Sequence, residues 1–133
     1  MMMKGRAMKG FVAAAAAVLG LAVIAPSVAG HHSTNAMYDE SKTVEVVGTV
    51  VQWRFVNPHP YLVVEMTTNG KTEKWDLSFG GSAVSHLRRQ GYTAESFKIG
   101  EVIIARGQPA TSETTKGILV RGGITRKDGT KIP

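Results

Sequence analysis

Three histidines have positions that suit them for binding a transition metal. His31 and His32 are adjacent and directly follow the small residues 26–30, and His59 lies between Pro58 and Pro60. Neutral imidazole is a good ligand for copper, nickel and zinc, and Cu(II) stands at the top of the affinity order for nitrogen and oxygen sites. The sequence therefore predicts a metal site with His31, His32 and His59 as ligands and Cu(II) as the preferred ion.

Residues 1–30 have the three-part pattern of an export signal. Basic residues (Lys4, Arg6 and Lys9) precede an apolar run from Phe11 to Ile24, and small residues follow it. The apolar run is short for a membrane span, so cleavage is favoured over the alternative, an uncleaved anchor. We therefore expect residues 1–30 to be a signal peptide and the product to be soluble and periplasmic, with no membrane span after cleavage.

Two cleavage sites fit the small residues, and each leaves different metal ligands. A cut after Gly30 makes His31 the first residue, whose α-amine and imidazole can chelate one ion together while a remote histidine completes the set. A cut after Ala29 places His32 third, and the amine, two deprotonated amides and that imidazole suit square-planar Cu(II) or Ni(II). The alternative interpretation is a polar arm that happens to begin with histidines.

His59 is the expected remote ligand, but its loop also has a structural interpretation. The two prolines can shape the turn while Asn57 hydrogen-bonds its own backbone. His86 is expected on the outer face of a helix, exposed to solvent.

Composition limits the other functions. The 133-residue chain has no cysteine, which excludes disulfides, thiolate metal sites and lipid attachment at a cysteine. Residues 31–133 carry thirteen basic and ten acidic residues, so their net charge is +3 and argues only weakly for an anionic partner. We expect no nucleic acid partner, because the compartment would hold little of it. No catalytic constellation is recognisable, so an enzyme is not expected.

The elements that must position these histidines are mostly strands. Residues 31–43 are polar without periodicity and are predicted to form an N-terminal arm. Gly48 is expected to bend the first strand, Asn69-Gly70 to form a hairpin turn, and Ser82 and Gly91 to cap a helix. The predicted strands span 44–56, 61–67, 71–79, 101–107 and 117–125.

This order of elements predicts the fold class. Three strands, a helix and two further strands match a mainly β, five-stranded OB-like barrel with one helix between strands three and four, spanning residues 44–133. An SH3-like barrel and an irregular α+β roll are the alternatives. The strand aromatics are expected in the core, or otherwise on an exposed face for a sugar, peptide or lipid. They are Trp53, Tyr61, Trp75 and Phe79.

Several motifs carry a family resemblance. They are HHS at 31–33, Tyr38-Asp39, GTVVQWRFVNPHPYLVVE at 48–65, EKWDL at 73–77, LRRQGYTAESFKIGEVIIARGQPA at 87–110 and KDGTKI at 127–132. In these motifs the chain resembles the exported domain-of-unknown-function family 6152. The resemblance implies an exported small barrel and no named activity.

Two functional hypotheses remain at this point. The first is an exported binding protein that takes up Cu(II) or another transition metal through its mature N-terminal histidines. The second is a metal-free periplasmic accessory module that binds a small molecule or a protein partner. An oxidative copper enzyme is less favoured, because about a hundred residues leave little room for a substrate platform.

Overall fold

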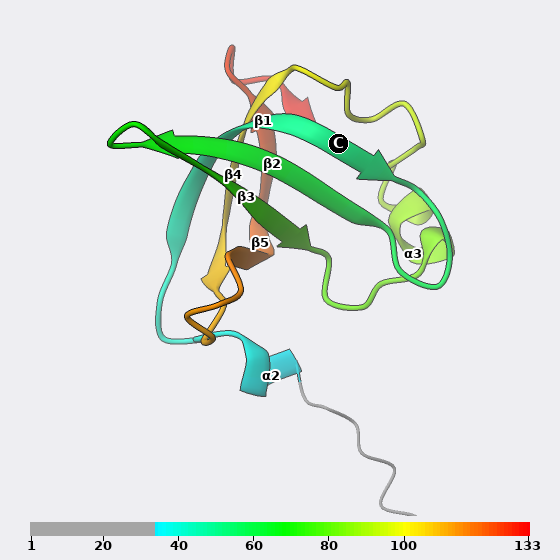
Figure 1. The fold of residues 1–133 in the computed structure, drawn as a ribbon. Coiled ribbons are helices and arrows are strands. Elements are labelled where there is room, and N and C mark those ends of the chain that lie inside the picture. Colours follow the sequence, from blue (N-terminus) through cyan, green and yellow to red (C-terminus); the bar gives the residue numbers. More distant parts are fainter. Residues whose placement is uncertain (1–33) are drawn as a thin grey trace, which may run out of the picture. The chain divides into compact units, whose positions relative to one another are not determined.

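The structure is a computed structural model of the chain and describes residues 34–133. Strands dominate it, with a short helix before the first strand and another between the third and fourth (Figure 1). The helices are α2 (Thr34–Met37) and α3 (Val84–Arg89). The strands are β1 (Val44–Arg54), β2 (Tyr61–Thr68), β3 (Lys71–Ser78), β4 (Val102–Pro109), β5 (Gly117–Arg126) and β6 (Lys131–Ile132).

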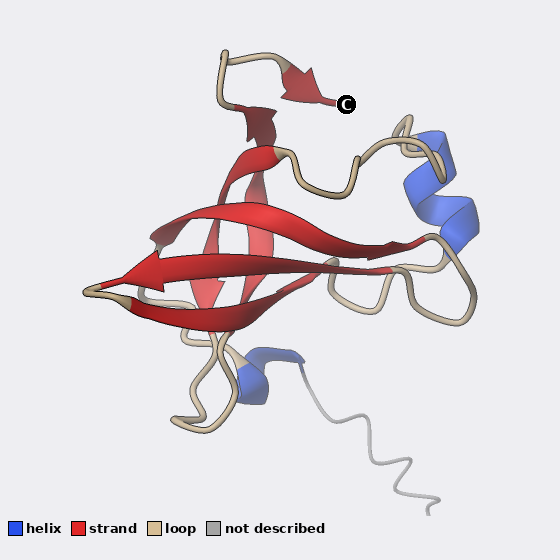
Figure 2. Ribbon diagram, turned by 45° about the horizontal axis from the view of Figure 1, so that its top comes forward, coloured by secondary structure: helices blue, strands red, loops and turns tan. Residues whose placement is uncertain are grey.

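The sheet closes on itself. Its strand order is β3-β2-β1-β4-β5-β6, and β3 pairs additionally with β5. That closing pair is parallel and joins Asp76–Ser78 to Gly117–Leu119, whereas the other pairs are antiparallel. Figure 2 shows the strands wrapped around the interior, with α3 at one end. The prediction is confirmed: the chain forms a five-stranded OB barrel with one helix between β3 and β4, and β6 adds a short strand to β5.

Alternate strand residues fill the barrel. Val46, Val50, Leu62, Leu77 and Ile103 are each at most 1% exposed, and they come from four different strands. Successive side chains of a strand point to opposite faces, so each strand supplies every second residue to the core. The alternating apolar residues of the sequence thus form the core of the closed barrel.

The first strand bends, but the irregularity is not at Gly48, where the sequence placed it. The pairing of β1 with β2 shifts register between Val50 and Gln52, so Val51 is the extra residue. Gly48 serves close packing instead, because a Cβ there would lie 2.7 Å from Val64 Cγ2.

The predicted hairpin turn and the predicted helix cap have different outcomes. The hairpin at Asn69-Gly70 is confirmed, since both residues have positive φ (53° and 76°), as a type I′ turn requires. The predicted helix cap at Ser82 is wrong: Ala83 occupies the N-cap position of α3 and makes no side-chain cap bond.

The end of the predicted arm is attached to the barrel through its backbone. Thr111 N donates to Met37 O and Asp39 N donates to Pro109 O, both at 2.9 Å, and Tyr38 forms an isolated bridge with Ala110. These contacts are made by the main chain, so they could not be predicted from the side chains of residues 31–43. Residues 37–39 therefore lie on the β4–β5 loop.

The predicted export signal, residues 1–30, and the metal ligands His31 and His32 lie outside the described residues. No helix among residues 34–133 combines the length and apolar character needed to cross a bilayer.

Candidate functional site

The β1–β2 loop, residues 55–60, carries the one predicted metal ligand that the structure describes. The sequence suggested that Asn57 in this loop hydrogen-bonds its own backbone, and the structure shows a different partner. Asn57 Oδ1 instead accepts a hydrogen bond from Val84 N at 3.3 Å, which satisfies a free amide at the start of α3. The loop is thereby attached to the helix that follows β3.

His59 makes a second bond between the same two segments. Its ring is exposed, and Nδ1 lies 3.1 Å from the carbonyl oxygen of Gly81. A carbonyl oxygen can only accept, so Nδ1 carries the hydrogen and Nε2 of the neutral ring keeps its lone pair. Histidines that bind metals in proteins commonly donate their other ring N–H to a carbonyl in this way.

The carbonyl that receives this bond belongs to a glycine pair. Gly80 and Gly81 both have positive φ (69° and 76°), a conformation that side chains with a Cβ rarely adopt. Two consecutive left-handed residues turn the chain sharply between β3 and α3. The glycine pair, which the sequence indicates only as a strand breaker, thus shapes the backbone that holds the His59 ring.

His59 is not part of a three-residue ligand group in the described part of the chain. Residues 34–133 contain no group of three or more histidine, cysteine, aspartate or glutamate side chains that could hold a metal ion. His86 is exposed on α3, as predicted, and its ring contacts Gln90 Nε2 at 3.0 Å rather than His59. The structure therefore brings together His59 and Gly81, while the other two predicted ligands are not described.

An aromatic cluster lies beneath the β1–β2 loop. The Trp53 ring centroid lies 4.9 Å from that of Phe97, 5.6 Å from that of Phe55 and 5.9 Å from that of Phe79. Trp53 Nε1 donates to Thr93 O at 3.0 Å. Edge and tilted contacts of this kind are favourable for aromatic rings. The loop that carries His59 thus starts from a well-packed base.

The aromatic side chains of the strands divide between core and surface. Trp53, Trp75 and Phe79 are partly buried and pack against the core, as the default prediction has it. Tyr61 is 39% exposed, so its prediction as a core residue is wrong. It begins β2 opposite Arg54, and Gln52 Nε2 donates to its hydroxyl at 3.3 Å.

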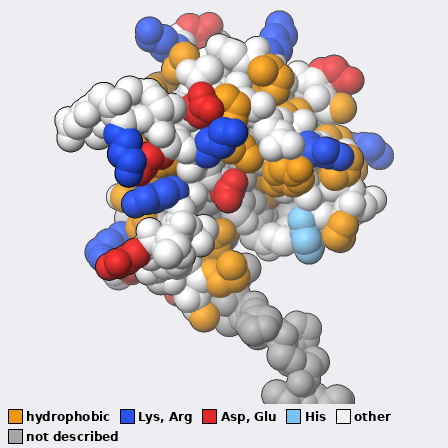
Figure 3. All heavy atoms as spheres, in the orientation of Figure 1, with side chains coloured by type: hydrophobic (Ala, Val, Ile, Leu, Met, Phe, Trp, Pro, Cys, Tyr) orange, Lys and Arg blue, Asp and Glu red, His pale blue; other side chains and the backbone are white. Residues whose placement is uncertain are grey.

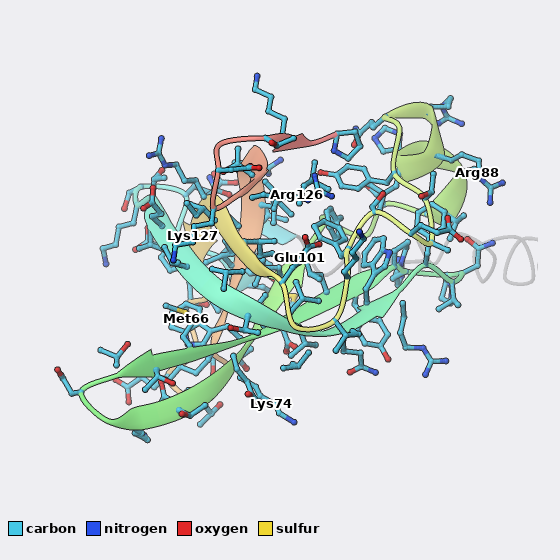
Figure 4. All side chains as sticks on the ribbon, turned by 90° about the horizontal axis from the view of Figure 1, so that it is seen from above. Met66, Lys74, Arg88, Glu101, Arg126 and Lys127 are labelled. Atoms are coloured by element: carbon cyan, nitrogen blue, oxygen red, sulfur yellow. The ribbon has the colours of Figure 1, made fainter. Side chains whose placement is uncertain are left out.

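Charged side chains of both signs are mixed over the barrel. Arg106 pairs with Glu45 at 2.7 Å, and Arg126 pairs with Glu101 at 3.2 Å (Figure 4). The face in Figure 3 shows acidic and basic groups interspersed without a large patch of one sign. On this face the pattern suits a solvated surface.

The segment that follows α2 contains the most perturbed carboxyl group of the described chain. Hydrogen bonds from the Ser41 side chain and from Lys42 Nζ lower the pKa of Asp39 from 3.8 to about 2. Ser41 Oγ lies 2.6 Å from Asp39 Oδ1, and Lys42 Nζ lies 2.9 Å from Oδ2. Donors to the ionised form of a carboxyl group favour that form. The contacts are local and stabilise the turn into β1.

Comparison with known proteins gives a family and a fold. The sequence model of a family described as "Family of unknown function (DUF6152)" matches residues 17–128. No curated protein matches the chain significantly.

Solved structures with a similar fold share little sequence with the chain. The mitochondrial single-stranded DNA-binding protein Rim1 of S. cerevisiae is 10% identical, with a TM-score of 0.46 over 65% of this chain and 92% of its own. A structure of the S. pombe Stn1–Ten1 complex is 14% identical, with a TM-score of 0.43 over 63% and 57%. The small single-stranded DNA-binding protein of Streptomyces coelicolor is 15% identical, with a TM-score of 0.41 over 65% and 91%.

These structures correct one prediction. The sequence-based expectation of no nucleic acid partner is wrong as an exclusion, because structures with a similar fold include single-stranded DNA-binding proteins. The likeness itself shows the fold alone and assigns no ligand to this chain.

Proposed function

We propose that this chain, which belongs to the family of unknown function DUF6152, is an exported small-barrel protein that binds a divalent transition metal through His59. The supporting observation is the contact of His59 Nδ1 with the Gly81 carbonyl at 3.1 Å, which leaves Nε2 as an available ligand on an exposed ring. Cu(II) is the best-suited ion, because it has the highest affinity for nitrogen ligands among the common divalent metals.

The attachment of the β1–β2 loop supports the same proposal. Asn57 and His59 each make a hydrogen bond across to the segment between β3 and α3. A ligand whose orientation is set before the metal arrives loses less conformational freedom on binding. His59 is therefore better prepared for metal binding than an unattached surface histidine.

Export and the participation of His31 and His32 belong to the proposal on the strength of the sequence. The pattern of residues 1–30 is that of an export signal, and cleavage near Gly30 would leave an α-amine beside two imidazoles. An α-amine and an imidazole of one residue form a chelate, which binds Cu(II) more tightly than a lone imidazole.

The experiment uses the protein recovered from the exported fraction. Its intact mass gives the first residue and shows whether residues 1–29 or 1–30 are absent. Titration with Cu(II), followed by electron paramagnetic resonance, gives the affinity and the number of nitrogen ligands. We expect His59→Ala to weaken Cu(II) binding at least about tenfold, because the loss of a supporting group alone commonly costs that much.

His86→Ala is the matched control. His86 is an exposed imidazole on the same molecule whose ring contacts only Gln90 and Arg89 among the described residues. Its replacement should leave the Cu(II) affinity unchanged. Equal affinity of the wild type and His59→Ala would show that His59 is not a ligand. Equal affinity of the wild type and the double variant His31→Ala/His32→Ala would remove the N-terminal histidines from the site.

The second candidate function is the metal-free module that binds a small molecule. A hollow beside α3 that is lined by apolar and polar side chains favours it.

A further inference from the structure

A hollow of about 420 Å³ lies between α3, β5 and the segment that follows β3. Its volume is within the range of small-molecule sites in proteins, about 300–1,000 Å³. Phe79, Leu87 and Val120 contribute apolar side chains, while Ser82, His86, Gln90, Tyr92 and Arg121 contribute polar groups. Apolar side chains beside polar groups that can orient a ligand are found together in ligand sites.

Tyr92 is the most informative residue of the hollow. Its side chain is almost fully enclosed, with 6% exposed, yet its hydroxyl has no hydrogen-bond partner among the described residues. Residues 34–133 contain no fully sealed side-chain oxygen or nitrogen without a partner, so this hydroxyl keeps some accessible surface, and Tyr92 is one of the residues that line the hollow. Burial raises the pKa of the phenol, which keeps it protonated and able to donate at neutral pH.

Arg121 places a positive charge at the same hollow. No carboxylate of the described residues lies within ion-pair distance of it, and its Nε makes one long contact of 3.4 Å, to Gln108 Oε1. None of the side chains that line the hollow is acidic. The guanidinium group is therefore available to an anionic ligand, for which planar carboxylates are well matched.

A bulge in β5 forms this edge of the hollow. Gly107 pairs with Val120 and Ala105 with Ile124, so one residue of β4 faces three residues of β5, Arg121 to Gly123. Gly123 has φ of +79°, and a Cβ there would meet nothing within 4 Å. Bulges of this kind change the direction of a side chain and are frequent beside functional sites.

We infer that the hollow between α3 and β5 binds a small aromatic carboxylate. The ring contacts the surface formed by Phe79, Leu87 and Val120. The carboxylate accepts hydrogen bonds from the Tyr92 hydroxyl and the Arg121 guanidinium. This site does not involve His59 and is independent of the proposed metal.

The first test measures binding of three probe molecules to the metal-free protein in the presence of a chelator. Benzoate carries the ring and the charge, benzyl alcohol the ring alone, and acetate the charge alone. We expect benzoate to give saturable NMR shifts at the amides of Gln90, Tyr92 and Arg121. Benzyl alcohol and acetate should bind at least about tenfold more weakly, because each lacks one of the two interactions. Absence of a saturable benzoate shift at these amides would overturn the inference.

The second test uses variants that remove single groups. Tyr92→Phe removes the hydroxyl and keeps the ring, and Arg121→Gln removes the charge of an exposed side chain. Each should weaken benzoate binding about tenfold or more, as expected for a hydrogen bond to a charged group. If Tyr92→Phe changes the fold, Arg121→Gln is the decisive variant, because the Arg121 side chain is exposed and is not part of the core.

Two controls separate the outcomes. Arg88→Gln removes an exposed arginine of α3 that lies over Phe55 and does not line the hollow, so benzoate affinity should be unchanged. His59→Ala should also keep benzoate binding, whatever its effect on Cu(II). Equal loss of benzoate affinity in Arg88→Gln and Arg121→Gln would show a general charge effect and refute the site.

Discussion

Single atoms decide which ligands would suit the two proposed sites of this barrel. At His59 the Gly81 carbonyl takes up Nδ1–H, so the remaining nitrogen has a lone pair for a metal. At Tyr92 the reverse holds, since the phenol is enclosed without a partner and keeps its proton for a ligand. The free lone pair of His59 depends on the hydrogen bond from Nδ1 to Gly81, and the free proton of Tyr92 depends on the absence of such a partner among the described residues.

The indole N–H of Trp53 gives a prediction at this scale. Trp53→Phe leaves the Thr93 carbonyl without the donor that lies 3.0 Å away, and it also removes part of a packed ring. Trp75→Phe is the matched control, because Trp75 is also partly buried and its indole N–H has no partner among the described residues. We expect Trp53→Phe to lower the free energy of unfolding by about 0.5–1.5 kcal/mol more than Trp75→Phe does, as measured by urea denaturation. Equal losses would show that the Trp53 hydrogen bond contributes nothing net.

At the scale of elements, the β1–β2 loop and α3 depend on each other. The helix has only six residues and no cap from its own sequence, and Asn57 supplies the missing acceptor from a distant loop. Short helices are marginal by themselves and are held by such tertiary contacts. The segment that carries His59 is thus also the segment that begins the helix.

Asn57→Ala tests this dependence. Removing the acceptor for Val84 N should lower the free energy of unfolding by about 1 kcal/mol, the usual cost of a lost N-cap. Ser82→Ala is the control, because Ser82 is the cap that the sequence suggests but makes no cap bond. Its effect should stay within about 0.5 kcal/mol, as for surface substitutions. A larger loss for Ser82→Ala than for Asn57→Ala would contradict the observed cap.

The pairing of β4 with β5 gives a second prediction for the elements. A Cβ on Gly107 would lie 2.1 Å from Leu119 O, a backbone atom that cannot move away without breaking the strand pair. On Gly122 the nearest atom would be Arg106 Cβ at 3.2 Å, so a much smaller shift would be needed. We expect Gly107→Ala to lower the free energy of unfolding by at least about 1–3 kcal/mol and Gly122→Ala by less. Thermal denaturation followed by circular dichroism measures both.

At the scale of the described domain, the barrel is closed by β3–β5 pairing and extended by the segment before β1. Residues 37–39 lie along the β4–β5 loop. The Asp39 carboxylate accepts a hydrogen bond from Ser41 Oγ and forms an ion pair with Lys42. The start of the domain is thus tied to a loop about seventy residues later in the chain.

The ionisation of Asp39 reports on the turn that leads from this attachment into β1. Its pKa is lowered from 3.8 to about 2, chiefly by the Ser41 side-chain hydrogen bond and then by Lys42. A lowered carboxyl pKa adds stability above pH about 4, and that contribution is lost as the pH falls toward 2. We expect the NMR shift of the Ser41 amide, which donates to Asp39 Oδ1, to titrate with a midpoint near pH 2. Asp39→Asn should abolish the titration, and a midpoint near pH 4 in the wild type would contradict the hydrogen-bonded turn.

The fold was largely determined by local pattern. Strand alternation, the Asn69-Gly70 turn and the glycine after the helix are short-range signals, because period-two burial and positive φ depend on neighbouring residues. The strand order then leaves few closed arrangements, and the predicted OB barrel is among them. The candidate ligand His59 was likewise identified from its own sequence context, between two prolines.

What only the tertiary structure decided are contacts between residues far apart in the chain. The sequence contains Asn57, Gly81 and Val84. It does not show that the β1–β2 loop caps α3 or that a glycine carbonyl orients the His59 ring. It also contains Tyr92 and Arg121 without showing that both line one hollow, with Arg121 in a bulge of β5. Such contacts depend on how the barrel closes, and closure is a property of all five strands together rather than of any segment.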